Sequence, residues 1–186
     1  IGPADEPDKE GLEFINEIKG GNIPKEFIPA IEKGFRVSMN TGTLAGYEVE
    51  NMKVRLMDGS YHAVDSDALS FEVAAKMAFK NATRKAKKIL LEPIMALEVS
   101  TPEEYLGDVT SDLNKRRASV ENVTSRPGGI QVISAKVPLS EMFGYVTSLR
   151  TITSGRATSS MEFSAYEPAP EQVKEEIVTK AGYNIN

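Results

Sequence analysis

The order of apolar patterns in the second half of the chain restricts the fold more than any other feature of the sequence. Between residues 94 and 165, apolar residues alternate in four segments, which predicts strands. In two further segments they recur every three or four residues, which predicts helices. The order is strand, helix, strand, strand, helix, strand. It is the order of a ferredoxin-like βαββαβ sandwich.

Individual residues support this order. Residues 101–104, Thr-Pro-Glu-Glu, predict a capping box with proline at the first helical position. Residues 125–129 predict a hairpin turn and residues 153–156 a polar turn. The two helices are predicted to present apolar stripes of Leu106, Val109 and Leu113, and of Leu139, Phe143, Val146 and Leu149. The strands are marked by Met95, Leu97, Val99, Val120, Val123, Ile133, Ala135, Val137, Met161, Phe163 and Ala165, with Met161 and Phe163 expected in the core.

The first half centres on a strand, a polar loop with the only histidine, and a long helix. Met52, Val54 and Leu56 alternate with basic residues, which predicts the strand. The helix stripe is predicted to comprise Phe71, Ala74, Ala75, Ala78, Phe79 and Ala82. In the loop, Asp58-Gly59 predicts a chain reversal through a glycine of positive φ. Asp65, Ser66 and Asp67 offer side-chain oxygens for the helix N-cap.

The remaining elements complete an α+β chain. A short strand is predicted near residues 12–15, and a helix that starts regularly only after Pro24. A further strand is predicted from Tyr47, with a bulge or bend at residues 50–51. Glu92-Pro93 is predicted to separate the halves, because proline cannot continue a helix. Pro168 and Pro170 precede a C-terminal helix.

Composition excludes several classes of site. The 186 residues include no cysteine and one histidine, so no disulfide framework, zinc site or thiol nucleophile is available, which fits a reducing cytoplasm. No apolar run approaches a membrane span. The net charge of −5 argues against a simple nucleic-acid binder, DNA included. Basic clusters at residues 84–88 and 115–117 are interpreted as compensation of helix dipoles. No G-x-x-x-x-G-K-[ST] sequence is present to cradle a nucleotide.

Two long stretches resemble a known family. The sequence DGSYHAVDSD at residues 58–67, followed by SFEVAAKMAFK, is similar to the tip of the fourth domain of bacterial elongation factor G. Residues 92–117 and 138–163 resemble its fifth domain. The resemblance implies domain IV at residues 1–90, incomplete at its N-terminus, domain V at residues 91–166, and a C-terminal helix and tail at residues 167–186. It implies a partial ribosomal-protein-S5-domain-2-like fold for the first domain and a ferredoxin-like fold for the second.

The resemblance also implies a function. The intact factor couples GTP hydrolysis, with magnesium, to translocation of transfer and messenger RNA through the ribosome. This region would be its ribosome-contacting end, with no cofactor and no hydrolysis of its own. The tip loop would enter the decoding centre, where His62 can donate, accept and stack against RNA. The implied contacts of the loop are Gly59, Ser60, Tyr61, His62, Asp65 and Ser66. Arg126 and Arg156 of the second domain are implied contacts of large-subunit RNA at the factor-binding centre.

Other interpretations remain open. A paralogous ribosomal GTPase, specialised for ribosome recycling or ribosome protection, shares this architecture. A stand-alone RNA-binding α+β protein would present stacking aromatic residues on a sheet, and this chain has no tryptophan. A metal site at Asp58, His62, Asp65 and Asp67 misses the calcium-loop spacing. Catalysis by His62 as a general base would have only Asp65 nearby to assist it.

Overall fold

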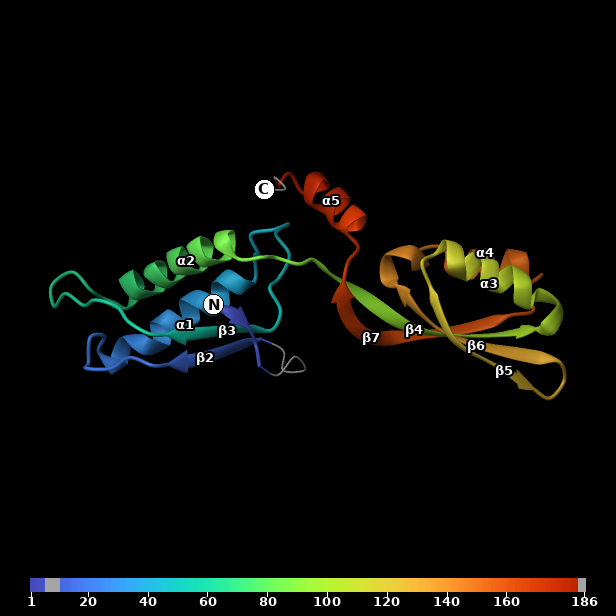
Figure 1. Ribbon diagram of the computed structural model, residues 1–186, viewed down its shortest axis with the longest axis horizontal. Coiled ribbons are helices and arrows are strands. Elements are labelled where there is room, and N and C mark those ends of the chain that lie inside the picture. The colour runs from blue at the N-terminus through green and yellow to red at the C-terminus, as the bar shows by residue number, and fades with distance from the viewer. Residues whose placement is uncertain (6–10, 184–186) are drawn as a thin grey trace. The chain divides into compact units, whose positions relative to one another are not determined.

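The computed structural model describes residues 1–5 and 11–183, and these form two compact units. The first comprises Ile1–Lys88 and the segment that begins at Glu171, and the second comprises Ile89–Pro170. Each unit holds one small β-sheet and its own helices (Figure 1). This confirms the predicted α+β class with two small sandwiches. The C-terminal helix, predicted as part of a separate segment from residue 167, belongs to the first unit.

The first unit is built on a three-stranded sheet. Its elements are β1 (Gly2–Pro3), β2 (Leu12–Asn16), α1 (Ile28–Met39), β3 (Met52–Leu56), α2 (Ala68–Lys85) and α5 (Glu171–Lys180). Strand β3 lies in the centre, parallel to β2 and antiparallel to β1. A 3-10 turn at Lys25–Phe27 precedes α1, so the regular helix begins after Pro24, as predicted.

The core of this unit lies between the sheet and the two long helices. Its buried residues are Ile23, Ile31, Phe35, Met39, Met52, Val54, Phe71, Ala75 and Phe79. Helix α2 buries one residue per turn, at Phe71, Ala75, Phe79 and Thr83. Ala74 and Ala78 of the predicted stripe are exposed, so the stripe is narrower than the sequence pattern suggests. One packed face is enough to hold the helix, because α1 packs against it and its buried residues join the same core as Met52 and Val54 of β3.

Helices α1 and α2 approach each other closely at Gly34. A Cβ at that position would lie 2.6 Å from the Glu72 carbonyl oxygen and 2.7 Å from the Ala75 Cβ. The Glu72 carboxylate accepts from Lys76 at 2.6 Å and from Lys33 of α1 at 2.9 Å. These two ammonium groups, Lys76 first, lower the pKa of Glu72 from 4.5 to about 2. The glycine contact and the ion pairs therefore fix the spacing of the helices.

The segment between α1 and β3 differs from the prediction. Residues 47–50 do not form a strand, because their backbone bonds to the end of α1: the Val49 N–H donates to the Met39 carbonyl at 2.8 Å. Asn51 then turns the chain into β3 with φ of +53°, at the bend that the sequence predicts. This loop also meets the C-terminal segment, since a Cβ at Gly46 would lie 3.1 Å from the Tyr183 hydroxyl oxygen.

The second unit has the predicted ferredoxin-like order. Its elements are β4 (Leu91–Pro102), α3 (Leu106–Lys115), β5 (Ser119–Arg126), β6 (Ile130–Pro138), α4 (Tyr145–Ile152) and β7 (Thr158–Pro168). The strands pair antiparallel in the order β5-β6-β4-β7. Pro127, Gly128 and Gly129 form the predicted hairpin turn, with φ of +87° and +72° at the two glycines.

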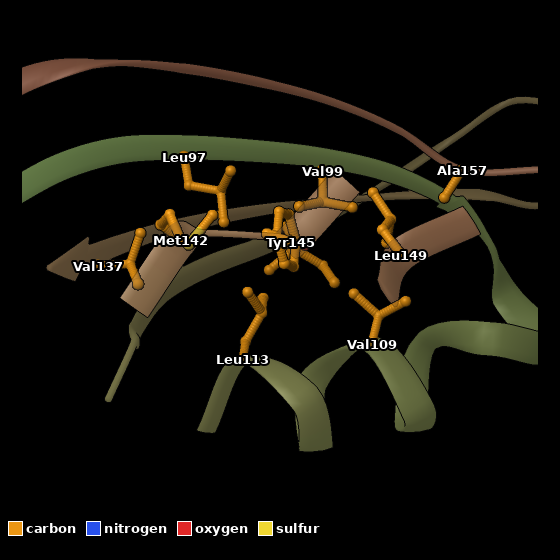
Figure 2. Packing of buried hydrophobic residues seen from close by; sticks show 10 residues of the cluster. Leu97, Val99, Val109, Leu113, Val137, Met142, Tyr145, Leu149 and Ala157 are labelled. Carbon is orange, nitrogen blue, oxygen red and sulfur yellow. The ribbon is translucent and has the colours of Figure 1, made fainter. Parts of the chain in front are cut away.

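Side chains from both helices meet the central strands in a second core. Figure 2 shows Val109 and Leu113 of α3 directed toward β4, beside Tyr145 and Leu149. The other members are Leu97, Val99, Ile133, Val137, Met142 and Ala157. Val99, Leu113, Ile133 and Val137 are fully buried. Burial of this apolar surface is the main stabilising term for such a small unit.

The predicted capping box does not form. Thr101 is buried within β4, where it pairs with Gln131, and its hydroxyl makes only a 3.4 Å contact with the Pro102 carbonyl oxygen. The 3-10 turn at Glu103–Tyr105, which leads into α3, begins after Pro102 without a side-chain cap. The Glu103 N–H instead donates to the Gly129 carbonyl at 3.0 Å, so the tertiary partner replaces the local cap.

The stripe predicted for the second helix is also shifted. A 3-10 segment at Leu139–Met142 ends before Gly144, whose φ of +74° resets the chain before α4. Met142, Tyr145 and Leu149 are therefore buried. Phe143, at 82% exposure, and Val146 face solvent. A left-handed residue interrupts the 3.6-residue period, so the sequence pattern cannot be extended through it.

Two further predictions for the sheet are wrong in part. Pro93 lies inside β4 rather than between the units, and there it pairs only with β7, because β6 pairing starts at Ile94. A residue without an N–H is tolerated beside an unpaired edge. Met161 and Phe163 lie in β7 as predicted, but they are exposed because β7 is an edge strand. The Phe163 ring packs on Tyr166, with centroids 5.2 Å apart.

Candidate functional site

The loop between β3 and α2 is the candidate site. Residues 57–65 are all exposed, and Val64 reaches 93% exposure. Strand β3 and helix α2, which flank the loop, both contribute to the core of the first unit. The loop therefore presents its side chains to solvent between two elements that are anchored in the core. In Figure 1 it forms the extended turn between β3 and the start of α2.

Hydrogen bonds close the loop on itself. The His62 N–H donates to Ser66 Oγ at 3.0 Å, and the Ser66 N–H donates to the His62 carbonyl at 2.9 Å. Asp67 caps α2, since its Oδ1 accepts from the Ser70 N–H at 2.7 Å. The bonds from Ser70 lower the pKa of Asp67. Among the described residues Asp65 has no hydrogen-bond partner, so of the two aspartates offered for capping, Asp67 is the cap.

A second loop supports the first. Asn22 Nδ2 donates to Asp58 Oδ1 at 2.9 Å, and the Gly59 N–H donates to the same oxygen at 2.8 Å. These bonds, that from Asn22 first, lower the pKa of Asp58. A Cβ at Gly59 would lie 2.5 Å from Ile23 Cδ1. The Ile23 side chain thus comes too close to the Gly59 backbone for any larger residue. The predicted positive φ at Gly59 is wrong, because Gly59 is not among the glycines of positive φ. Gly20 and Gly21 of the supporting loop are.

Aromatic rings link the loop to the core. The Tyr61 ring packs on Phe27, with centroids 5.7 Å apart, and Phe27 stacks on Phe71 at 4.9 Å. Phe71 is buried at the start of α2. Tyr61 is thus held against the unit by its ring, while its neighbour His62 is exposed. Such ring pairs stabilise by about 0.5–1.5 kcal/mol beyond the area that they bury.

The loop offers hydrogen-bonding groups and an aromatic ring to solvent. No side-chain hydrogen bond joins the His62 imidazole to another described residue, so both ring nitrogens are available. Across residues 1–5 and 11–183, no group of three His, Cys, Asp or Glu side chains could hold a metal ion. Gly59, Ser60 and His62 offer backbone and side-chain groups that can donate, accept or stack. In the same residues, no helix has the length and apolar character needed to cross a membrane.

The two arginines predicted in the second unit both have acidic neighbours. Arg126 Nη2 lies 3.9 Å from Glu98 Oε1. Arg156 forms an ion pair with Glu104 and lies over the Tyr105 ring, 5.6 Å from its centroid. Their side chains remain more than half exposed. Each arginine therefore carries less uncompensated charge than its place on a turn suggests.

Sequence reasoning missed two parts of the site. Val64 is the most exposed large hydrophobic residue among those described, and its place between polar residues of the loop was the available signal. The loop at residues 20–22 lies 36 residues from the Asp58 that it supports, and only Gly20-Gly21-Asn22 marked it as a turn. In Figure 1 both loops lie at the same end of the first unit.

Comparison with known proteins assigns each unit. The model of elongation factor G domain IV matches residues 1–87, and that of the elongation factor G C-terminus matches residues 89–177. The chain belongs to the elongation factor G family. Elongation factor G of Amoebophilus asiaticus is 56% identical over 186 residues, and that of Cytophaga hutchinsonii is 60% identical over 175 residues. These alignments cover 100% and 94% of this chain.

The match is to a part of the larger factor. This chain spans 26% of the Amoebophilus elongation factor G and 25% of the Cytophaga protein. A crystal structure of a Thermus thermophilus protein is similar in fold, with a TM-score of 0.86 and 38% identity. That similarity covers 97% of this chain and 26% of the Thermus chain. The chain thus corresponds to domains IV and V of elongation factor G.

Proposed function

We propose that this chain is the ribosome-contacting end of a translocase of the elongation factor G family. In the intact factor, GTP hydrolysis in another domain would drive movement of transfer and messenger RNA, and this end would engage the ribosome. The observation that carries the proposal is the exposed loop at residues 58–66, closed by the His62–Ser66 bonds and supported by Asn22 and Phe27. A loop held in this way can enter a narrow RNA site without losing its shape.

The residues of the loop would have different roles. His62 would bind RNA directly, because an exposed imidazole can hydrogen-bond a base edge or stack on its face. Gly59 and Ser60 would bring the backbone close to the decoding centre. Tyr61 would position His62, because the Tyr61 ring packs against Phe27. Asp65 would remain at the rim, and Ser66 would hold the loop closed.

The GTPase chemistry would lie outside this chain. The sequence holds no phosphate-cradling loop, so we propose that GTP and magnesium bind a domain that these residues do not include. The chain by itself would bind and hydrolyse no nucleotide, and it would act in the cytoplasm, where ribosomes are. Arg126 and Arg156 would contribute weak contacts to large-subunit RNA, since Glu98 and Glu104 partly neutralise them.

Site-specific crosslinking tests the proposal. A photoreactive side chain at Val64, placed in the full-length factor and bound to ribosomes, should crosslink to RNA of the decoding centre or to the RNAs held there. The control position is Val37, which is exposed on α1 of the same unit. Crosslinks that are equally frequent from both positions, or absent from Val64, would contradict the placement of the loop.

A further inference from the structure

Charge is distributed very unevenly along this acidic chain. Residues 73–91 contain six lysines or arginines and no aspartate or glutamate, a local charge of +6. Because the whole chain carries −5, the other residues together carry −11. Five of the six cations, which we call the basic segment, lie within nine residues: Lys80, Arg84, Lys85, Lys87 and Lys88.

The basic segment lacks acidic partners inside the first unit. Twelve other cations of the described residues form ion pairs, among them the sixth cation of the stretch, Lys76, which binds Glu72. No carboxylate of residues 1–5 or 11–183 lies within ion-pair distance of the basic segment. Four of its five side chains are exposed, and Lys88 is half-buried. Its charge is therefore available to a partner.

Compensation of the helix dipole explains only part of this segment. Helix α2 ends at Lys85, and Ala86 follows in extended conformation with ψ of 148°. The dipole acts over the last turn, so it accounts for Arg84 and Lys85. Lys80 precedes that turn, and Lys87 and Lys88 lie beyond the helix. Lys80 and Arg84 are also spaced as i and i+4, where like charges repel each other. Folding alone does not require this arrangement.

We propose that the basic segment binds the phosphate backbone of RNA. Lysine ammonium groups are flexible point charges, so a row of them can follow a phosphate backbone without a fixed geometry. The segment offers no aromatic side chain between Lys80 and Lys88, so it would read charge rather than sequence. The RNA is ribosomal, an identification that rests on the proposed function. This second contact would anchor the first unit through α2, at the opposite end of that helix from the 58–66 loop.

The test is the salt dependence of binding to ribosomes and, separately, to a short RNA duplex of mixed sequence. The variant is Arg84→Gln, Lys85→Gln, Lys87→Gln and Lys88→Gln together in the 186-residue chain. The matched control replaces four dispersed cations without ion pairs among the described residues: Lys19, Lys25, Lys115 and Arg150, each by Gln. Both variants lose four charges, and glutamine preserves helix propensity.

Each released phosphate contact lowers the slope of log affinity against log salt by about 0.7–0.9. The variant should therefore lose a slope of about three, so that wild type weakens about sixtyfold more than the variant between about 50 and 200 mM salt. The dispersed control should retain most of the wild-type slope. An unchanged slope in the variant would overturn the proposal. Equal losses in variant and control would overturn it too, because net charge alone would then explain binding.

Two additions separate this inference from the proposed function. Direct binding of polyglutamate, at the same charge concentration as the RNA duplex, separates the two kinds of partner. Weaker binding of polyglutamate than of the duplex by wild type identifies RNA as the partner; tighter binding of polyglutamate that is lost in the variant would identify an acidic protein and overturn the proposal. His62→Ala in the full-length factor is scored by its rate of translocation, which the proposed function expects to fall. Slow translocation by His62→Ala, together with an unchanged salt slope in the four-residue glutamine variant, would keep the loop as an RNA contact and rule out the basic segment. Normal translocation by His62→Ala, together with a reduced salt slope in the four-residue glutamine variant, would keep the basic segment and rule out the loop.

Discussion

His62 and Ser66 hold each other through two hydrogen bonds, from the His62 N–H to Ser66 Oγ at 3.0 Å and from the Ser66 N–H to the His62 carbonyl at 2.9 Å. The pair closes a five-residue turn whose other side chains face solvent. It leaves the imidazole free, because only backbone atoms of His62 are used. The geometry thus separates the groups that hold the loop from the group that is proposed to bind RNA.

Ser66→Ala should loosen the loop without unfolding the unit. The lost hydroxyl acceptor is worth about 1 kcal/mol, so exchange of the His62 amide hydrogen should become roughly fivefold faster. Ser60→Ala is the control, because Ser60 makes no hydrogen bond to another described residue. Ser66→Thr keeps the oxygen and should restore slow exchange. Equal exchange rates in wild type and Ser66→Ala would show that this bond does not close the loop.

Gly34→Ala should destabilise the first unit by about 1–3 kcal/mol, because the new Cβ would overlap the backbone of α2 at Glu72 and the Ala75 side chain. Gly107→Ala is the matched control in α3, where nothing lies within 4 Å of the new Cβ. It should be neutral or stabilise by up to about 1 kcal/mol. Hydrogen exchange of the α1 and α2 amides measures the first effect. Unchanged exchange in Gly34→Ala would mean that the helices separate freely.

Glu72 should make the first unit sensitive to acid. Its pKa is about 2 in the folded protein, below the ordinary 4.5, because of Lys76 and then Lys33. A lowered folded-state pKa stabilises the fold above pH 4.5, and this contribution is lost as the pH falls from 4.5 toward 2. Glu72→Gln should flatten the fall in stability across that window, and the two proteins should converge near its acid end. Parallel pH profiles for wild type and variant would contradict the role of these ion pairs.

Two buried hydroxyls of the second unit should respond oppositely to removal. The Tyr145 hydroxyl has no hydrogen-bond partner among the described residues, and burial raises its pKa to about 12. Tyr145→Phe should therefore leave the free energy of unfolding unchanged or raise it by up to about 1 kcal/mol. The Thr153 hydroxyl donates to the Leu149 carbonyl at 2.7 Å and accepts from the Ala157 N–H at 3.2 Å. Thr153→Val should cost about 1–3 kcal/mol by thermal denaturation.

A reversed order of these two variants would show that the hydroxyl of Tyr145 has a partner in solution. The Arg116 guanidinium lies 5.2 Å from the centre of the Tyr145 ring, and that contact is kept in the phenylalanine variant. The comparison therefore isolates the hydroxyl from the ring.

The order of elements was predictable because each is marked by a local period. Met52, Val54 and Phe71 lie where alternation and helical spacing place them. Predictions failed where distant partners replaced local ones. Thr101 remains in the sheet because Gln131 pairs with it, although its own neighbours form the pattern of a capping box.

The candidate site was predictable in position and only partly in construction. Exposure of His62 follows from its polar neighbours. The support from Asn22 and Ile23 does not, since no local pattern relates residues 36 positions apart. Gly59 illustrates the limit, because the sequence identifies a glycine whereas only the structure shows that the Ile23 side chain requires it.

The rate of translocation by full-length factor carrying His62→Ala decides whether the imidazole binds RNA. A stacked base–ring contact is worth about 1–3 kcal/mol, so the rate of movement should fall roughly tenfold, while ribosome-stimulated GTP hydrolysis stays near wild type. Folding should change by under about 0.5 kcal/mol, because the side chain is exposed. His62→Lys should fail to restore the rate if the ring itself binds RNA. Translocation at the wild-type rate in His62→Ala, measured by fast kinetics, would contradict the proposed role of His62 and leave the loop as a solvated turn.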